Sequence, residues 1–269
     1  MRIGILGYGQ LGRMLAMAGL PLGFSFDFYD PTLKKVFRSL TPSDAPVWAD
    51  EKAFEQFLNE CDIFTYETEN TAASLVETIV AQKPMFPGSE ALVTTQHRVK
   101  EKSFCQSLGI AVTEFHPVHS LSECFVAAES LAFPFVLKTS TQGYDGKGQV
   151  VIETASQVED AWNQLNDANL IAEKWVSFEH ECSLIAVRSR LGEVLFYPLV
   201  ENVHEKGILQ YSMVCPNHPQ TQEAEAIARK ILEAFQYVGV LTIEFFSTDR
   251  GLLVNEIAPR VHNSGHWSI

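Results

Sequence analysis

The chain has 269 residues, of which 46% are hydrophobic and 20% charged, as in an ordinary globular protein, and its length predicts about two domains. The formal net charge of −13 argues against a nucleic-acid-binding surface, because polyanions are held by clustered lysine and arginine. The five cysteines form no close pairs, which argues against a zinc site or a disulfide framework. No apolar stretch approaches the length of a membrane span. These features predict a soluble, cytoplasmic protein that binds neither nucleic acid nor a membrane.

The first part of the chain alternates between strand and helix patterns. Strands are expected at 3–6, 24–28 and 63–67, and helices at about 11–18, 51–59 and 71–82. This alternation predicts an α/β domain with a Rossmann-like parallel sheet and helices on both of its faces.

A glycine-rich turn, Gly7-x-Gly9-x-x-Gly12, follows the first strand and matches the dinucleotide-binding fingerprint. Its glycines would let backbone N–H groups approach an anion. The turn is therefore consistent with NAD or FAD, with another phosphate-bearing ligand, or with a tight β–α turn alone. Asp30, which precedes Pro31, is interpreted as a turn residue in preference to a ribose ligand.

Two glutamates stand at the carboxyl end of the strand at 63–67, the usual ligand side of an open parallel sheet. Glu67 is either a ligand-binding residue or part of the N-terminal cap of the next helix. Glu69 is interpreted as part of that cap, where acidic side chains are favourable.

From His97 onwards the pattern changes. Strands are expected at 111–115, 135–138, 150–153 and 170–176, and helices at 99–108, 121–131 and 155–165. The remainder predicts a largely antiparallel sheet, with strands at 183–188 and 194–200, a helix at about 221–235 and a hairpin that begins at Val240.

A second glycine-rich loop, Gly143-Tyr144-Asp145-Gly146-Lys147-Gly148-Gln149, lies between two expected strands. Its backbone could wrap phosphates like a lid, but it is not a Walker loop, because Gln149 stands where lysine is required. Lys138, just before it, is interpreted as a phosphate-binding cation in preference to a solvated edge charge. In the next strand, Glu173 to Val176 could offer backbone groups to an adenine edge, with Trp175 either beside the base or in the core.

The hairpin raises a question of charge. With Arg250 near its axis, Glu244 lies opposite Glu256 on one face, where like charges destabilise each other. A magnesium ion between the carboxylates would remove the repulsion, because magnesium prefers oxygen ligands and bridges carboxylates to phosphates. The alternative is an acidic face on which each carboxylate points to solvent.

Taken together, the strand lysine, the glycine-rich lid, the adenine-edge strand and the acidic hairpin resemble the ATP-grasp superfamily. Within it, GYGQLGRM, GYDGKGQ and NEIAPRVHNSGHW are similar to segments of the 5-(carboxyamino)imidazole ribonucleotide synthases, the ATP-dependent carbon–nitrogen ligases that carboxylate 5-aminoimidazole ribonucleotide in purine biosynthesis. The resemblance implies a Rossmann-like domain at 1–96 and an ATP-grasp fold of two α+β subdomains. The small subdomain with its lid is expected at 97–176 and the large subdomain at 177–269. The resemblance implies a further small C-terminal domain, which we expect this chain to lack, so we expect it to bind ATP but to turn over poorly.

The resemblance also assigns residues. It implies ATP contacts at Arg98, Lys138, Gly143, Tyr144, Asp145, Gly146, Lys147, Gly148, Gln149, Glu173, Lys174, Trp175, Val176, Glu181, His204, Asn255 and Glu256. It implies Mg²⁺, or alternatively Mn²⁺, at Glu244 and Glu256. It implies substrate contacts at Gln10, Leu11, Glu67, Tyr144, Asp145, Arg260 and Asn263, and catalytic charge compensation by Lys138, Lys147 and Arg260.

The implied reaction is phosphoryl transfer from ATP to bicarbonate, followed by carboxyl transfer to the aminoimidazole, in a homodimeric enzyme. One alternative is another ATP-grasp enzyme, such as the formate-dependent glycinamide ribonucleotide transformylase. A dinucleotide-binding oxidoreductase, with NAD at the first glycine turn, is an alternative from a different class.

Overall fold

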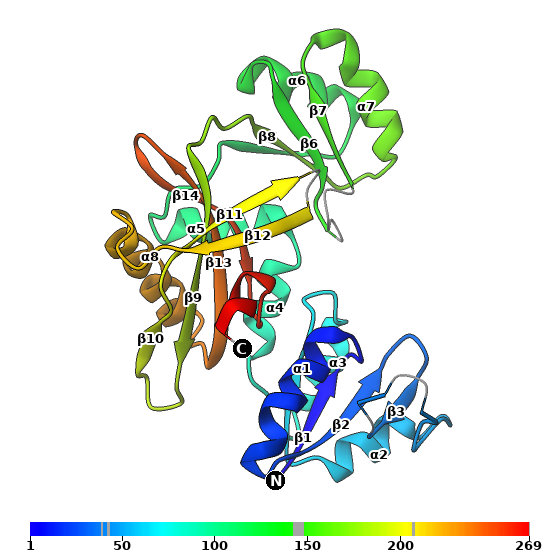
Figure 1. Cartoon of the computed structure of the whole chain (residues 1–269). Coiled ribbons are helices and arrows are strands. Elements are labelled where there is room, and N and C mark those ends of the chain that lie inside the picture. Colours follow the sequence, from blue (N-terminus) through cyan, green and yellow to red (C-terminus); the bar gives the residue numbers. More distant parts are fainter. Residues whose placement is uncertain (39, 42–43, 142–147, 206–207, 269) are drawn as a thin grey trace.

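The structure is a computed structural model that describes residues 1–38, 40–41, 44–141, 148–205 and 208–268 (Figure 1). Three β-sheets form three separate parts of the molecule. Among the described residues, no helix combines the length and apolarity needed to span a membrane.

The N-terminal part folds around a four-stranded sheet with strand order β3-β2-β1-β4. Strands β1, β2 and β4 are parallel, which confirms the predicted Rossmann-like arrangement, whereas β3 adds an antiparallel edge that was not predicted. Phe28 on one face of the sheet packs in a cluster with Ala16 of α1, and Phe64 on the other face packs in a cluster with Phe57 of α2, so helices cover both faces. The elements are β1 (Arg2–Leu6), α1 (Gln10–Gly19), η1 (Leu20–Leu22), β2 (Ser25–Asp30), β3 (Lys35–Phe37), α2 (Ala53–Glu60), β4 (Ile63–Tyr66) and α3 (Ala73–Val80).

Asp30 is a turn residue, as expected. Its Oδ1 accepts hydrogen bonds from the backbone N–H groups of Thr32 (2.8 Å) and Leu33 (2.9 Å). The carboxylate therefore stabilises the chain reversal after β2.

The middle part forms an antiparallel four-stranded sheet with order β5-β8-β6-β7. Its elements are β5 (Phe115–Val118), α6 (Leu121–Leu131), β6 (Phe135–Thr139), β7 (Gln149–Ile152), η2 (Ala155–Gln157), α7 (Val158–Leu165) and β8 (Leu170–Lys174). The strand predicted at 111–115 is wrong, because Ala111 accepts a hydrogen bond from Val254 in another sheet and β5 begins only at Phe115. The residues expected to form one strand instead pass from one sheet to the next.

The last part forms an antiparallel sheet with order β12-β11-β9-β13-β14, and β10 pairs with β9. Its elements are β9 (His180–Arg188), β10 (Val194–Phe196), β11 (Val200–Glu205), β12 (Ile208–Val214), α8 (Thr221–Ala234), β13 (Gly239–Thr248), β14 (Gly251–Ala258) and η3 (Asn263–Ser268). The single strand predicted at 194–200 is two strands, because Pro198 between them has no N–H to donate to the ladder.

Two helices connect the N-terminal sheet to the rest, α4 (Ser89–Thr95) and α5 (Arg98–Ser107). Although α5 precedes the middle sheet in sequence, Cys105 and the following Ile110 pack in the core of the last sheet with Leu184 and Ile243. The first residues of the predicted small subdomain (97–176) therefore pack against the last sheet, which the prediction assigned to the large subdomain.

Candidate active site

The β13–β14 hairpin places two acidic residues directly across from each other. Glu244 pairs with Glu256 in the strand register, as predicted, but for a different reason. The turn is centred between Asp249 and Arg250, and a regular ladder from this turn would pair Glu244 with Asn255. A β-bulge at Asn255 supplies one extra residue and moves Glu256 into register.

The opposite face of the hairpin is apolar and fully packed. Ile243, Phe245, Val254 and Ile257 are each at most 1% exposed and belong to one hydrophobic core. Burying these side chains fixes which face of the hairpin carries the carboxylates.

A cavity of about 560 Å³ lies between the middle sheet and the last sheet. Most of the residues assigned from the sequence line it: Arg98, Lys138, Gln149, Glu173, Lys174, Trp175, Val176, Glu181, His204, Glu244, Asn255, Glu256, Arg260 and Asn263. Trp175 is 49% exposed, so its interpretation as a core residue is wrong. Residues 143–147 of the second glycine loop lie outside the described residues. Gly148 accepts a hydrogen bond from the Thr139 N–H (2.8 Å) and lies outside the cavity lining.

Glu69, which the sequence analysis interpreted as part of a helix cap, also lines the cavity. The lining further includes residues that the sequence did not single out: Thr113, Val136, Val151, Phe178, Ile208, Leu209, Phe246 and His262. The rings of Phe178 and Phe246 stack with centroids 4.8 Å apart. Because the two residues are far apart in the sequence, no local sequence pattern predicts that they are in contact. His262 falls within the NEIAPRVHNSGHW segment, six residues after Glu256, and this position could have marked it.

Lysine–glutamate contacts place positive charge on one wall of the cavity. Lys138 Nζ lies 2.8 Å from Glu173 Oε2, and Lys102 Nζ lies 3.7 Å from Glu173 Oε1. Burial alone would raise the pKa of Glu173, but the charges of Lys138 and Lys102 lower this pKa to about 2. The Glu173 carboxylate is therefore ionised at neutral pH, between two lysines.

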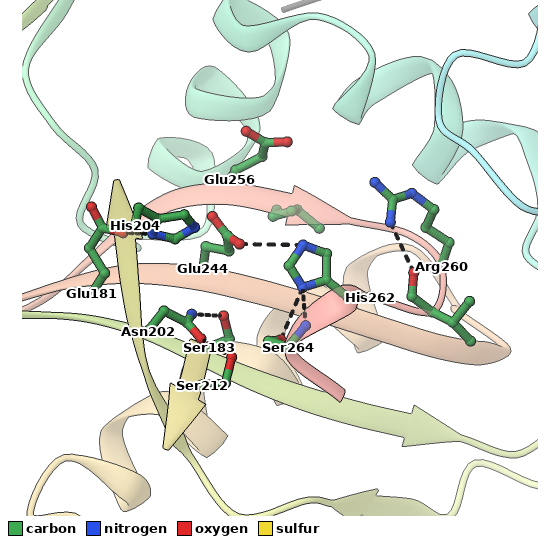
Figure 2. Close-up of polar contacts among 12 residues, drawn as sticks. Glu181, Ser183, Asn202, His204, Ser212, Glu244, Glu256, Arg260, His262 and Ser264 are labelled. Atoms are coloured by element: carbon green, nitrogen blue, oxygen red, sulfur yellow. Dashed lines mark hydrogen bonds and ion pairs between the residues drawn. The ribbon is translucent and has the colours of Figure 1, made fainter. Parts of the chain in front are cut away.

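The facing carboxylates each have a different neighbour, and Figure 2 shows that of Glu244, the His262 ring. Glu256 Oε2 lies 3.3 Å from Arg98 Nη1, and Glu244 Oε1 lies 3.3 Å from His262 Nε2. Burial and, next, the Glu256 charge raise the pKa of Glu244 to about 7. Burial, with the nearby Arg260, lowers the pKa of His262 to about 4, so this ring is neutral at pH 7. Because the Ser264 N–H donates to His262 Nδ1, the ring carries its proton on Nε2, which faces Glu244.

The donor chemistry of this pair fits a divalent cation. Two hard carboxylate oxygen donors share one cavity wall, and their mutual repulsion contributes to the raised pKa of Glu244. Among the residues that the structure describes, no group of three or more His, Cys, Asp or Glu side chains could hold a metal. Two carboxylates suit an ion such as Mg²⁺, which completes its shell with phosphate and water.

Glu67 does not reach this cavity and instead fills the first glycine turn. Its carboxylate accepts hydrogen bonds from the backbone N–H groups of Gly9 and Gly12, the latter at 2.6 Å. It therefore caps helix α1 and not the following helix α3, whose N-cap residue, Ala72, makes no side-chain capping hydrogen bond. Gly7 has φ of +109° and contacts the same side chain so closely that a Cβ would collide with it. The N–H groups that would bind a dinucleotide phosphate are already occupied.

Glu69 is an ion-pair partner and not a helix cap, so that interpretation is wrong. Its carboxylate contacts the Arg260 guanidinium, which belongs to the loop after β14. Gln96 Nε2 donates to the backbone carbonyls of Glu69 (2.7 Å) and Thr71 (2.6 Å), which holds the loop that presents Glu69. This contact ties the N-terminal part of the chain to the cavity.

Comparisons with known proteins agree with this architecture. Residues 103–269 match the ATP-grasp domain family, and residues 1–96 match the ribonucleotide synthetase preATP-grasp domain family. The fold and the site thus define an ATP-grasp protein with a preATP-grasp domain.

Similar proteins define a narrower group. The chain is 44% identical to N5-carboxyaminoimidazole ribonucleotide synthase of Pseudomonas aeruginosa over 100% of this chain and 75% of that protein. It is 35% identical to the Staphylococcus aureus (strain COL) synthase over 99% of this chain and 72% of that protein. The chain belongs to the N5-carboxyaminoimidazole ribonucleotide synthase family, which confirms the resemblance seen in the sequence.

Solved structures give the same result. The Staphylococcus aureus synthetase complexed with ADP matches with a TM-score of 0.90 and 35% identity, over 99% of this chain and 72% of that one. The Aspergillus clavatus synthase in complex with ADP and 5-aminoimidazole ribonucleotide matches with a TM-score of 0.86 and 29% identity, over 100% and 72%.

Proposed function

We propose that the chain carboxylates 5-aminoimidazole ribonucleotide to 5-(carboxyamino)imidazole ribonucleotide, using ATP and bicarbonate, in purine biosynthesis. The family supports this reaction, and a relative has been solved with ADP and 5-aminoimidazole ribonucleotide. The observation that carries the proposal is the pairing of Glu244 with Glu256 in a cavity that Arg98 and Lys138 also line. Paired carboxylates beside cations are suited to phosphoryl transfer, which depends on charge compensation.

ATP would occupy the cavity between the two sheets. The stacked Phe178 and Phe246 offer an apolar platform for the adenine, and the end of β8 offers backbone groups to its edge. The ammonium of Lys174 pairs with Glu114 (3.0 Å), so we assign its backbone to the nucleotide.

The polar groups would divide between the ribose and the phosphates. Glu181 and His204 hydrogen bond to each other in the cavity and suit the ribose hydroxyls. We assign Lys138 and Arg98 to phosphates, together with Asn255, Gln149 and Gly148. The loop residues Gly143, Tyr144, Asp145, Gly146 and Lys147 remain assigned to ATP by the family resemblance.

Mg²⁺, or Mn²⁺ in its place, would be held by Glu244 and Glu256. When bound, the ion would supply positive charge to the phosphate oxygens. The packed apolar face of the hairpin holds the two carboxylates on the cavity side before any cation arrives.

The substrate would lie toward the N-terminal part of the chain. Arg260, fixed by Glu69, and Asn263 line the side of the cavity where bicarbonate would react. Gln10 and Leu11 begin α1, and Glu67 supports the turn that presents them. Tyr144 and Asp145 are assigned to the aminoimidazole on the resemblance.

The reaction has two steps. An oxygen of bicarbonate attacks the γ-phosphorus of ATP, the bond to the bridging oxygen breaks, and ADP leaves as carboxyphosphate forms. The exocyclic amine of 5-aminoimidazole ribonucleotide then captures the carboxyl carbon, phosphate leaves, and the amine nitrogen loses a proton to give the carbamate. Lys138, Lys147 and Arg260 would offset the developing negative charge. Water must be kept out, because it would hydrolyse the activated intermediate.

The test is ADP release with bicarbonate, formate and 5-aminoimidazole ribonucleotide each supplied or omitted. We expect release to require bicarbonate and to rise with the aminoimidazole. Stimulation by formate in place of bicarbonate would instead favour the transformylase. Titration of nicotinamide fluorescence checks the oxidoreductase alternative, and we expect no binding, because Glu67 fills the glycine turn.

We also propose that the chain forms a homodimer through the edge of the large sheet. Strand β12 lies at that edge, and Tyr211 (59%) and Met213 (54%) are exposed on it, with Leu195 (74%) on β10. Exposed apolar residues on an edge strand are typical of an interaction surface. Sedimentation equilibrium of the wild type and of Tyr211→Lys tests this, and a wild-type monomer at all concentrations would contradict it.

A further inference from the structure

Helix α5 turns a charged stripe toward the interior of the protein. Glu101 and Lys102 are each only 2% exposed, and they share this face with Arg98 and Cys105. Most buried helix faces are apolar, because a buried charge is costly unless a partner offsets its lost hydration. The partners of these charges therefore indicate what the stripe does.

All three charged residues contact consecutive positions around the bulge in β14. Arg98 pairs with Glu256, and the Glu101 Oε2 accepts a hydrogen bond from the Ile257 N–H (3.2 Å). Lys102 Nζ donates to the Asn255 carbonyl (3.4 Å). The helix thus holds the strand at the point where the register shifts.

Lys102 also contacts Glu173 on the opposite wall of the cavity. Its ammonium lies 3.7 Å from Glu173 Oε1, while Lys138 binds Glu173 Oε2 at 2.8 Å. Glu173 belongs to β8 of the middle sheet and Asn255 to β14 of the last sheet. Lys138 and Glu173 line the cavity, whereas Lys102 lies behind them.

We infer that Lys102 is a positioning residue for nucleotide binding. It holds Glu173 against the β14 bulge, and it supplies a second cation to the Glu173 carboxylate. With both lysines present, the group carries one net positive charge, so Lys138 keeps an attraction for a phosphate. Without the Lys102 charge, Glu173 would neutralise Lys138. The inference rests on the proposed function and extends it to a residue that does not touch ATP.

The test compares Lys102→Met, which keeps the side-chain length and removes the charge, with Lys100→Met. Lys100 is exposed on the same helix and serves as the matched control. We expect Lys102→Met to weaken ADP binding, measured by calorimetry, about tenfold, as supporting groups behind a binding site commonly do. The KM for ATP should rise similarly, and the KM for 5-aminoimidazole ribonucleotide should not change. A merely structural defect would not separate the two KM values.

Two further variants keep the test decisive. Lys102→Arg retains the charge and should restore most of the ADP affinity. In a double-mutant cycle, Lys102→Met should reduce ADP affinity less when Glu173→Gln is already present, because the Glu173 carboxylate that Lys102 contacts is no longer charged. If Lys102→Met fails to fold, Lys102→Gln replaces it in every measurement.

Unchanged ADP binding by the folded neutral variants, or full additivity in the cycle, would overturn the inference. A wild-type chain that binds no ADP would overturn the proposed function as well. If the wild type binds ADP and Lys102→Met binds it with the same affinity, this inference alone is overturned.

Discussion

Glu244 and Glu256 are cross-strand neighbours only because Asn255 is the extra residue of a β-bulge. A bulge sets two residues against one, so Asn255 and Glu256 both reach the cavity. The hairpin therefore concentrates three polar side chains on one wall while its other face stays packed in the core.

Glu256→Gln should reduce magnesium-dependent ADP release by about 100-fold or more, because the amide removes one of two anionic donors from the proposed metal site. The measurement is ADP release with 5-aminoimidazole ribonucleotide and bicarbonate present. Glu129→Gln, an exposed position on α6, is the control. Release at the wild-type rate would refute the metal assignment.

Phe246→Ala should raise the KM for ATP about five- to tenfold, because an aromatic stacking partner contributes about 1 kcal/mol beyond its buried area. The ring stacks on Phe178 and lines the cavity. Steady-state kinetics with varied ATP measure the effect, with the exposed Phe125→Ala as control. An unchanged KM would place the adenine elsewhere.

Glu67→Gln should lower the free energy of unfolding by about 1–2 kcal/mol, because its carboxylate caps helix α1 through the N–H groups of Gly9 and Gly12. An amide would turn an N–H toward one of these donors. Urea unfolding of the variant and of Glu77→Gln, an exposed change on α3, gives the comparison. Equal stability of the two variants would show that the cap contributes little.

The Glu69–Arg260 pair should make stability depend on pH. Burial alone would raise the pKa of Glu69, but hydrogen bonding and the charge of Arg260 lower it below the ordinary 4.5. A lowered folded-state pKa gives stability that is complete above about pH 4.5 and is lost as pH falls through the lower value.

Glu69→Gln should therefore lower the free energy of unfolding by about 2 kcal/mol at pH 7, and this difference from the wild type should shrink on acidification. Free energies of unfolding at several pH values from 7 to about 3 measure this trend. A difference that stays constant with pH would mean that the charge of Glu69 does not contribute to the stability of the fold.

Much of the fold could be predicted from the sequence, because local signals and tertiary packing agree there. Helix α6 has the predicted bounds, and its start is marked by Ser120, whose hydroxyl accepts from the Glu123 N–H. The facing glutamates were also predicted, although the bulge that pairs them leaves no mark in the local pattern.

The rest depended on contacts between distant segments. The charged sequence of α5 is typical of a solvated helix, yet Lys102 is buried against Glu173. The hydrogen-bond donors of Glu67 lie 55 and 58 residues away in the sequence, and Phe178, between β8 and β9, stacks on Phe246 of β13. Such pairings follow from sheet topology, which residue patterns along the chain do not specify.

The most direct test of the central claim is a crystal structure with Mn²⁺ and a non-hydrolysable ATP analogue, with the metal located by its anomalous scattering. We expect a peak within bonding distance of carboxylate oxygens from both Glu244 and Glu256 and of a phosphate oxygen. A bound nucleotide without a metal shared by these two side chains would contradict the account.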